Sequence, residues 1–141
     1  MQDLTAQPNC VSIAIYDALK AVRAVTEAYA VIRNDRELDC DLLGPIRGMS
    51  CGGSAAALFS TRNAELLHGI ANSLETSIAG ETRTSIHFDE CSMSGAWEET
   101  HVSERGHALH RLQQALLTLE RRVSTVIMMR ETEKLTAEMR R

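Results

Sequence analysis

Residues 109–126 decide the fold of this chain, and they read LHRLQQALLTLERRVSTV. The apolar side chains recur at alternating intervals of three and four residues, which is the heptad pattern of a helix that buries one stripe against another helix. The next position of the stripe is Arg130, where the apolar seam stops, and we expect the helix to continue to about Met139 as a charged, solvated tail. A seam of this length can bury a partner helix, which predicts a homodimer. The residues of the predicted self-association seam are Leu109, Leu112, Leu116, Leu119, Val123 and Val126.

Two other segments have the periodicity of amphipathic helices. Between Val11 and Ile32, apolar residues again recur three and four positions apart, and the charged residues lie off that stripe. A second helix is expected to begin after Ser54, which has the side chain of an N-cap, and to end near Gly80. The three segments together predict an all-α fold, an antiparallel helical bundle of three long helices plus one or two short helices. The start of the last helix is open, because Gly106 is either a tolerated interior glycine or the break between a short helix that contains Trp97 and the long one.

The segments between these helices are interpreted as loops. Residues 44–53 are rich in glycine and predict a hinge that lets two helices pack closely. Residues 81–94 lose the helical periodicity and are predicted to form an irregular acidic segment. Within them, Thr82 to Phe88 has some strand character, but a single short strand has nothing to pair with inside one chain, so we expect a long loop or an edge that pairs across a dimer. Residues 1–141 are predicted to form a single helical domain.

Composition and charge exclude several classes of protein. The chain has 141 residues, of which 44% are hydrophobic, and a net charge of −4, which indicates a folded acidic domain and not a disordered chain. It shows neither the basic region and apolar core of a secretory signal nor the run of about 20 apolar residues that spans a membrane, which predicts a cytoplasmic protein with no membrane contact. The four cysteines are accordingly expected to be free thiols. A negative net charge and an aromatic content of 4% argue against direct binding of nucleic acid.

Three Glu-x-x-His pairs are compatible with a metal site. On a helix, residues three apart turn a carboxylate and an imidazole toward the same ion, and ferritin-like bundles use two such pairs. A Glu/His metal-binding helical bundle is therefore one alternative function. A polar helix face with salt bridges explains the same residues, and our main prediction has no metal ligand and no cofactor. The pairs are Glu65 with His68, Glu98 with His101, and Glu104 with His107.

A second alternative comes from the segment between His68 and Leu74. With Asn72 between them, these residues form an arrangement that resembles the His-x-x-x-Asn-x-Leu sequence around the phosphate-accepting histidine in some two-component phosphotransfer helices. The resemblance implies a histidine exposed on the first helix of an antiparallel hairpin, with two hairpins paired into a four-helix dimer. It would make the protein a histidine phosphotransfer-like helical hairpin that uses His68.

The chain has no unambiguous catalytic signature, and we predict that it is not an enzyme. The glycine-rich segment, for example, lacks the lysine that a phosphate-binding Walker loop needs. The acidic stretch around the only tryptophan is the predicted partner-binding surface, because tryptophan is enriched at interfaces and carboxylates suit a basic partner. We therefore predict a small cytoplasmic protein–protein interaction module, a regulator, inhibitor or adaptor that binds a basic surface such as the nucleic-acid-binding face of another protein. The predicted partner-binding residues are Asp89, Glu90, Trp97, Glu98 and Glu99.

Overall fold

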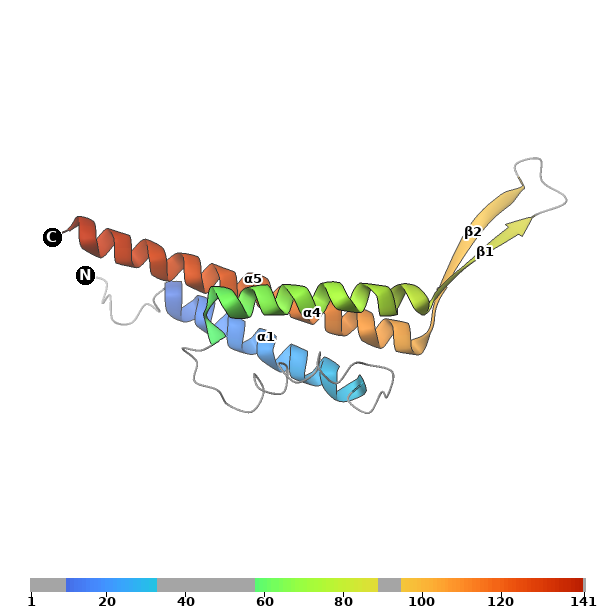
Figure 1. Ribbon diagram of the computed structural model, residues 1–141, viewed down its shortest axis with the longest axis horizontal. Helices are drawn as coiled ribbons and strands as arrows, with labels where there is room; N and C mark the ends of the chain where they lie inside the picture. Colours follow the sequence, from blue (N-terminus) through green and yellow to red (C-terminus); the bar gives the residue numbers. More distant parts are fainter. Residues whose placement is uncertain (1–9, 33–57, 89–94, 141) are drawn as a thin grey trace, which may run out of the picture.

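The computed structural model describes residues 10–32, 58–88 and 95–140, which form three long helices and a β-hairpin. Figure 1 shows the helices side by side and the hairpin projecting beyond them. The described part of the chain is thus mostly helical, and none of its helices is long and apolar enough to cross a membrane. In chain order the elements are α1 (Cys10–Ile32), α4 (Thr61–Gly80), β1 (Thr82–Phe88), β2 (Ala96–Val102) and α5 (Glu104–Met139).

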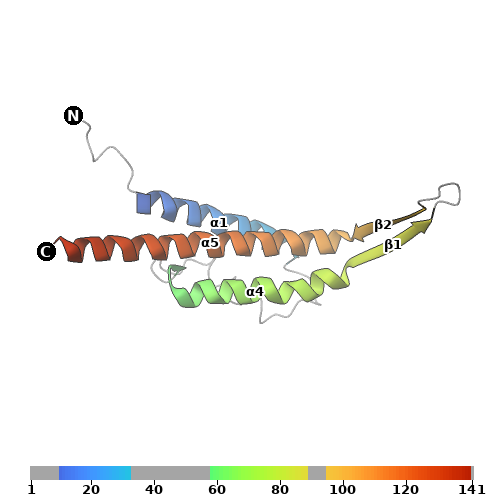
Figure 2. The same cartoon turned by 90° about the horizontal axis from the view of Figure 1, so that it is seen from above.

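Helix α5 is the central helix. It packs against both α1 and α4, and it lies between them in Figure 2. The colours in both views show that α1 and α4 run in one direction and α5 in the opposite one. From Arg130 onward every described side chain is exposed, and the helix ends at Met139, which confirms the predicted solvated tail.

The heptad seam of α5 forms the middle of the hydrophobic core. All six predicted seam side chains, from Leu109 to Val126, are fully buried inside the single chain. The helix prediction is confirmed, but helices of the same chain fill the seam, so it offers no surface to a second copy. A heptad pattern reports burial against a helix and does not tell which chain supplies that helix. The core residues from α1 and α4 are Ala18, Ala21, Val25, Tyr29, Ile32, Ala64, Leu67, Ile70, Ala71 and Leu74.

Helix α4 begins at Thr61, after the N-cap residue Ser60. The Ser60 hydroxyl accepts a hydrogen bond of 3.2 Å from the backbone N–H of Asn63, which satisfies one of the free donors of the first turn. The predicted end at Gly80 is confirmed. The predicted start after Ser54 is wrong for this helix, because Phe59 and Ser60 are not helical and separate α4 from the residues before them. Ser54 itself and the glycine-rich segment lie outside the described residues.

The hairpin corrects the prediction of an all-α fold. Thr82–Phe88 forms β1, and it pairs with a strand of the same chain, β2, which contains Trp97 and was expected to be a short helix. The pairing is antiparallel and runs from Thr82 opposite Val102 to Phe88 opposite Ala96. Residues 96–102 read AWEETHV, and their aromatic and β-branched side chains suit a strand better than a helix. The structure is therefore a helical bundle with a small two-stranded sheet.

A short junction fixes the hairpin to the helices. Glu81 follows α4, and its backbone oxygen accepts a hydrogen bond of 3.1 Å from the Ser103 N–H. The Glu81 carboxylate accepts two more, from the Ser103 hydroxyl at 2.5 Å and from Arg105 at 3.0 Å. Ser103 is also the N-cap of α5, because its hydroxyl accepts from the Gly106 N–H at 3.0 Å. The end of α4 and the start of α5 are thus held together where the two strands leave them.

Candidate functional site

The hairpin projects from the helical body (Figure 1), and its register assigns the side chains to two faces. In an antiparallel pair, residues directly opposite each other share a face, and successive residues alternate between faces. One face, here called the apolar face, consists of Thr82, Thr84, Ile86, Phe88, Ala96, Glu98, Thr100 and Val102. The other, here called the histidine face, consists of Arg83, Ser85, His87, Trp97, Glu99 and His101.

The apolar face exposes large hydrophobic side chains. Ile86 is 59% exposed and Phe88 is 74% exposed. They are two residues apart on β1, so they are neighbours on this face, and Glu98 lies directly opposite Ile86. A two-stranded sheet is only marginally stable by itself, and this one leaves its apolar area in water. Apolar surfaces of this kind are typical of interaction sites.

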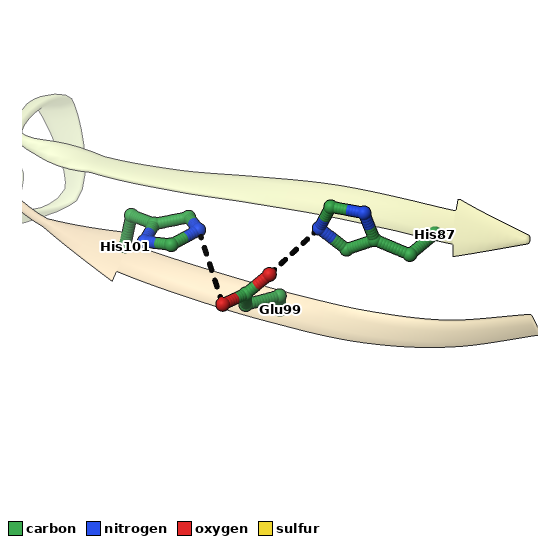
Figure 3. A group of neighbouring side chains, drawn as sticks. All are labelled: His87, Glu99 and His101. Atoms are coloured by element: carbon green, nitrogen blue, oxygen red, sulfur yellow. Dashed lines mark ion pairs between the residues drawn. The ribbon is translucent and has the colours of Figure 1, made fainter.

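Three side chains of the histidine face converge, as Figure 3 shows. Glu99 lies between the two histidines, with its Oε2 atom 2.7 Å from His87 Nε2 and its Oε1 atom 3.6 Å from His101 Nε2. Glu99 and His101 are two residues apart on β2, and His87 is diagonal to Glu99 across the strands, so the register of the hairpin sets these distances. The three residues can each offer one ligand atom, and these atoms lie within 4.8 Å of one another. Two imidazoles and a carboxylate are a donor set that binds divalent transition metals.

Trp97 orders the ring of His87. The two residues are directly opposite in the register, and their rings are stacked, with centroids 5.5 Å apart and planes inclined by 22°. The His87 Nε2 atom is shielded from solvent and makes no hydrogen bond within the described part of the chain. It lies 2.7 Å from Glu99 Oε2 without the geometry of a hydrogen bond.

The structure separates the predicted partner-binding residues. Trp97, Glu98 and Glu99 are all exposed on β2, but Glu98 belongs to the apolar face and the other two to the histidine face. The prediction assumed an irregular segment, in which neighbouring residues can share one surface, whereas a strand sends them alternately to opposite sides. Asp89 and Glu90 lie outside the described residues. The role of these residues in binding stays a prediction.

The Glu-x-x-His pairs do not form the metal-compatible group. Glu98 and His101 lie on opposite faces of β2, because residues three apart on a strand point to opposite sides. The group instead joins His101 to His87 and Glu99, which sequence reasoning missed. The signal was the Glu-x-His spacing of residues 99–101, which places two ligands on one side of a strand. The remaining pairs, on helix surfaces, join no metal-compatible group within the described residues: Glu65 with His68, and Glu104 with His107.

His68 is exposed on α4 and has a carboxylate partner on α5. Its side chain is 54% exposed, and its Nδ1 atom lies 3.2 Å from Oε2 of Glu120. Exposure is what the resemblance to phosphotransfer helices implies for this histidine. A carboxylate at Nδ1 also favours the tautomer with the proton on that nitrogen, which leaves the lone pair on Nε2.

No protein-family model, curated protein or solved structure matches the chain. The function is therefore inferred from the residues themselves, above all from those of the hairpin.

Proposed function

We propose that this chain is a protein–protein interaction module whose hairpin binds a basic and partly apolar surface of another protein. The observation that carries the proposal is the apolar face, where Ile86 and Phe88 are exposed on an element that projects from the helical body. By occupying a surface of the partner, the chain would act as its regulator or inhibitor, or as an adaptor that links it to another protein. A cytoplasmic location belongs to the same proposal, and so does a homodimer, which would have to form through a surface other than the α5 seam because that seam is filled within one chain.

The exposed apolar side chains supply a reason for binding. Removing apolar surface from water contributes about 25 cal/mol for each Å² buried, and aromatic side chains dominate the binding energy of many interfaces. Phe88 is the last residue of β1, at the end of the strand that lies away from the helices in Figure 1, and Ile86 is its neighbour on the same face. A partner that covers these two side chains would also stabilise the two-stranded sheet.

The charge of the hairpin indicates which kind of surface it would bind. Residues 82–102 include four acidic residues and one arginine, so this stretch is acidic whatever the shape of its turn. Glu98 lies on the apolar face itself, directly opposite Ile86. Complementary charge raises the rate of association and selects between partners, and its effect weakens as salt screens it. A basic surface is therefore the expected occupant.

Site-specific photocrosslinking tests the proposal in cells that express the chain. A photoreactive residue at position 88 should crosslink to a protein with a basic surface, whereas one at the exposed helix position 66 should not. The partner is then identified by mass spectrometry and purified, and its affinity is measured at low and high salt. We expect Phe88→Ser to weaken binding by about 30-fold, the effect of a typical interface anchor, while Leu66→Ser has no effect. Crosslinks confined to position 66, or equal affinities for the two variants, would contradict the proposal.

One observation favours a second candidate function, phosphotransfer through His68. This histidine is exposed, and Glu120 holds its Nδ1 atom, which leaves Nε2 as the nucleophile. Phosphoramidate phosphorylates accessible histidines, and phosphorus NMR can follow the reaction. His68 should react faster than the exposed His107 and His110, and Glu120→Gln should remove the difference. Equal rates at the three histidines would leave no support for this candidate.

A further inference from the structure

We propose that His87, Glu99 and His101 form a binding site for a divalent transition-metal ion, with Zn²⁺ as the expected ligand. The site lies on the histidine face of the hairpin and joins β1 to β2. It lies on the face opposite Ile86 and Phe88, so it does not depend on partner binding through those two side chains.

The distances between the donor atoms suit a zinc ion. Zinc binds imidazole nitrogen and carboxylate oxygen at about 2.0–2.2 Å, so two ligand atoms in a tetrahedral site lie about 3.3 Å apart. The separations are 2.7 Å between Glu99 Oε2 and His87 Nε2 and 3.6 Å between Glu99 Oε1 and His101 Nε2, and one ligand atom from each of the three residues lies within 4.8 Å of the other two. Side-chain rotations alone would bring one oxygen and the two nitrogens to a common ion, without any change of the backbone.

The burial of His87 Nε2 and its lack of a hydrogen bond point to the same site. A buried nitrogen without a hydrogen-bond partner calls for an explanation, and an ion at that position is one of the usual ones. Here the nitrogen is shielded from solvent, lacks a hydrogen bond within the described residues, and faces a carboxylate oxygen. A cation between the two atoms would satisfy both at once. The stacked Trp97 ring holds the imidazole in place, which reduces the entropy lost when the ion binds.

The chemistry of the donors selects the class of metal. Imidazole nitrogen suits zinc, copper, nickel and iron, whereas magnesium and calcium require mostly oxygen ligands. Three protein ligands also leave a position of a tetrahedral site open to water or to another donor. The expected consequence for the fold is a link between the two strands, because binding to the folded hairpin alone stabilises it by mass action.

The test is a titration of the full-length chain, free of any histidine tag, with Zn²⁺ and separately with Mg²⁺. Calorimetry should find one Zn²⁺ per chain and no binding of Mg²⁺. In NMR spectra of the imidazole groups, the signals of His87 and His101 should shift, and those of the other three histidines should stay in place. Acidification should weaken binding, since protons compete for the imidazole nitrogens.

Two neighbouring carboxylates provide a matched pair of variants. Glu99→Gln should weaken Zn²⁺ binding by at least about 100-fold, as expected for loss of a direct ligand, and Glu98→Gln on the opposite face should leave it unchanged. Circular dichroism checks that both variants keep their helices. Equal effects of the two substitutions would overturn the proposal, and so would shifts spread over all five histidines.

The cysteines are the competing ligands for zinc, and Co²⁺ distinguishes them by its absorption. Thiolate ligands give cobalt an intense charge-transfer band in the near ultraviolet, which a site of two imidazoles and a carboxylate lacks. The absence of that band at one equivalent supports the hairpin site, and its presence overturns it. A chelator separates the two proposals. It removes the metal ion but leaves Ile86 and Phe88 in place, so partner binding through the apolar face should persist.

Discussion

The middle of α5 and the hairpin differ in what their side chains touch. The six seam residues of α5 have no exposed surface, whereas Ile86, Phe88 and Trp97 in the hairpin are each more than half exposed. Both regions are regular secondary structure, and Ser103 is the one residue between the end of the hairpin and the start of α5. The difference is what the proposed function requires, in which the helices supply the stability of the fold and the hairpin would supply the surface for recognition.

The junction connects these two roles. Glu81 binds Ser103 and Arg105, so the direction of the hairpin depends on the ends of α4 and α5. A change in the helices can therefore alter the hairpin, but a change on the exposed faces of the hairpin should leave the helices intact. Substitutions in the two regions can test this asymmetry.

The largest effect is expected in the seam. Leu116→Asp places a charge at a fully buried position with no partner for it, and should lower the free energy of unfolding by more than about 4 kcal/mol. The matched control is Leu66→Asp on the outer side of α4, where the side chain is 40% exposed and the cost should be about 1 kcal/mol or less. Urea denaturation followed by circular dichroism measures both.

The same measurement bears on self-association. Because helices of the same chain fill the seam, Leu116→Asp should unfold the protein and not release a folded monomer. A folded monomeric variant, obtained from a dimeric wild type, would show that the seam lies between chains after all. Light scattering of the wild-type chain tests the predicted homodimer directly, and a monomer would contradict it.

An intermediate effect is expected at the junction. A Cβ at Gly106 would lie 2.6 Å from Val102 Cγ1 and 3.0 Å from Glu81 Cβ, so Gly106→Ala should destabilise the protein by about 1–2 kcal/mol despite the better helix propensity of alanine. Gly69 on α4 has no atom within 4 Å of the corresponding position, and Gly69→Ala should stabilise the protein by up to about 1 kcal/mol. Thermal unfolding of the two variants gives the signs. If both substitutions change the stability in the same direction, the close contacts at Gly106 do not constrain the junction.

The helices could be predicted from the sequence because their periodicity reports burial directly. The stripe from Leu109 to Val126 is strict, and each of its residues is buried as expected. The origin of the partner helix could not be predicted, because two helices of one chain and two copies of a single helix require the same apolar pattern. Spacing alone also left the start of α5 open, since Gly106 is compatible with a break between two helices as well as with an interior position of one helix.

The hairpin was missed because it does not bury one face. A half-buried strand alternates apolar and polar residues, but β2 has exposed side chains on both faces and reads AWEETHV. Without that alternation, the metal-binding alternative assumed the i, i+3 spacing of a helix and paired His101 with Glu98 instead of Glu99. Once the strands are paired, the register alone brings His87 next to Glu99.

The smallest effect is expected from Ile86→Thr on the apolar face, and the same substitution at Ile70 in α4 gives the contrast. Ile86 is exposed and threonine is a good strand former, so the free energy of unfolding should change by no more than about 0.5 kcal/mol. Ile70 is buried in the core, and Ile70→Thr should cost about 2 kcal/mol or more, because it leaves a small cavity and buries a hydroxyl. Thermal and urea unfolding in the presence of a chelator measure both. If Ile86→Thr lowers the free energy of unfolding by more than about 1 kcal/mol, the apolar face is already covered in the isolated protein. If that effect becomes smaller when the protein is diluted, a second copy of the chain covers the face.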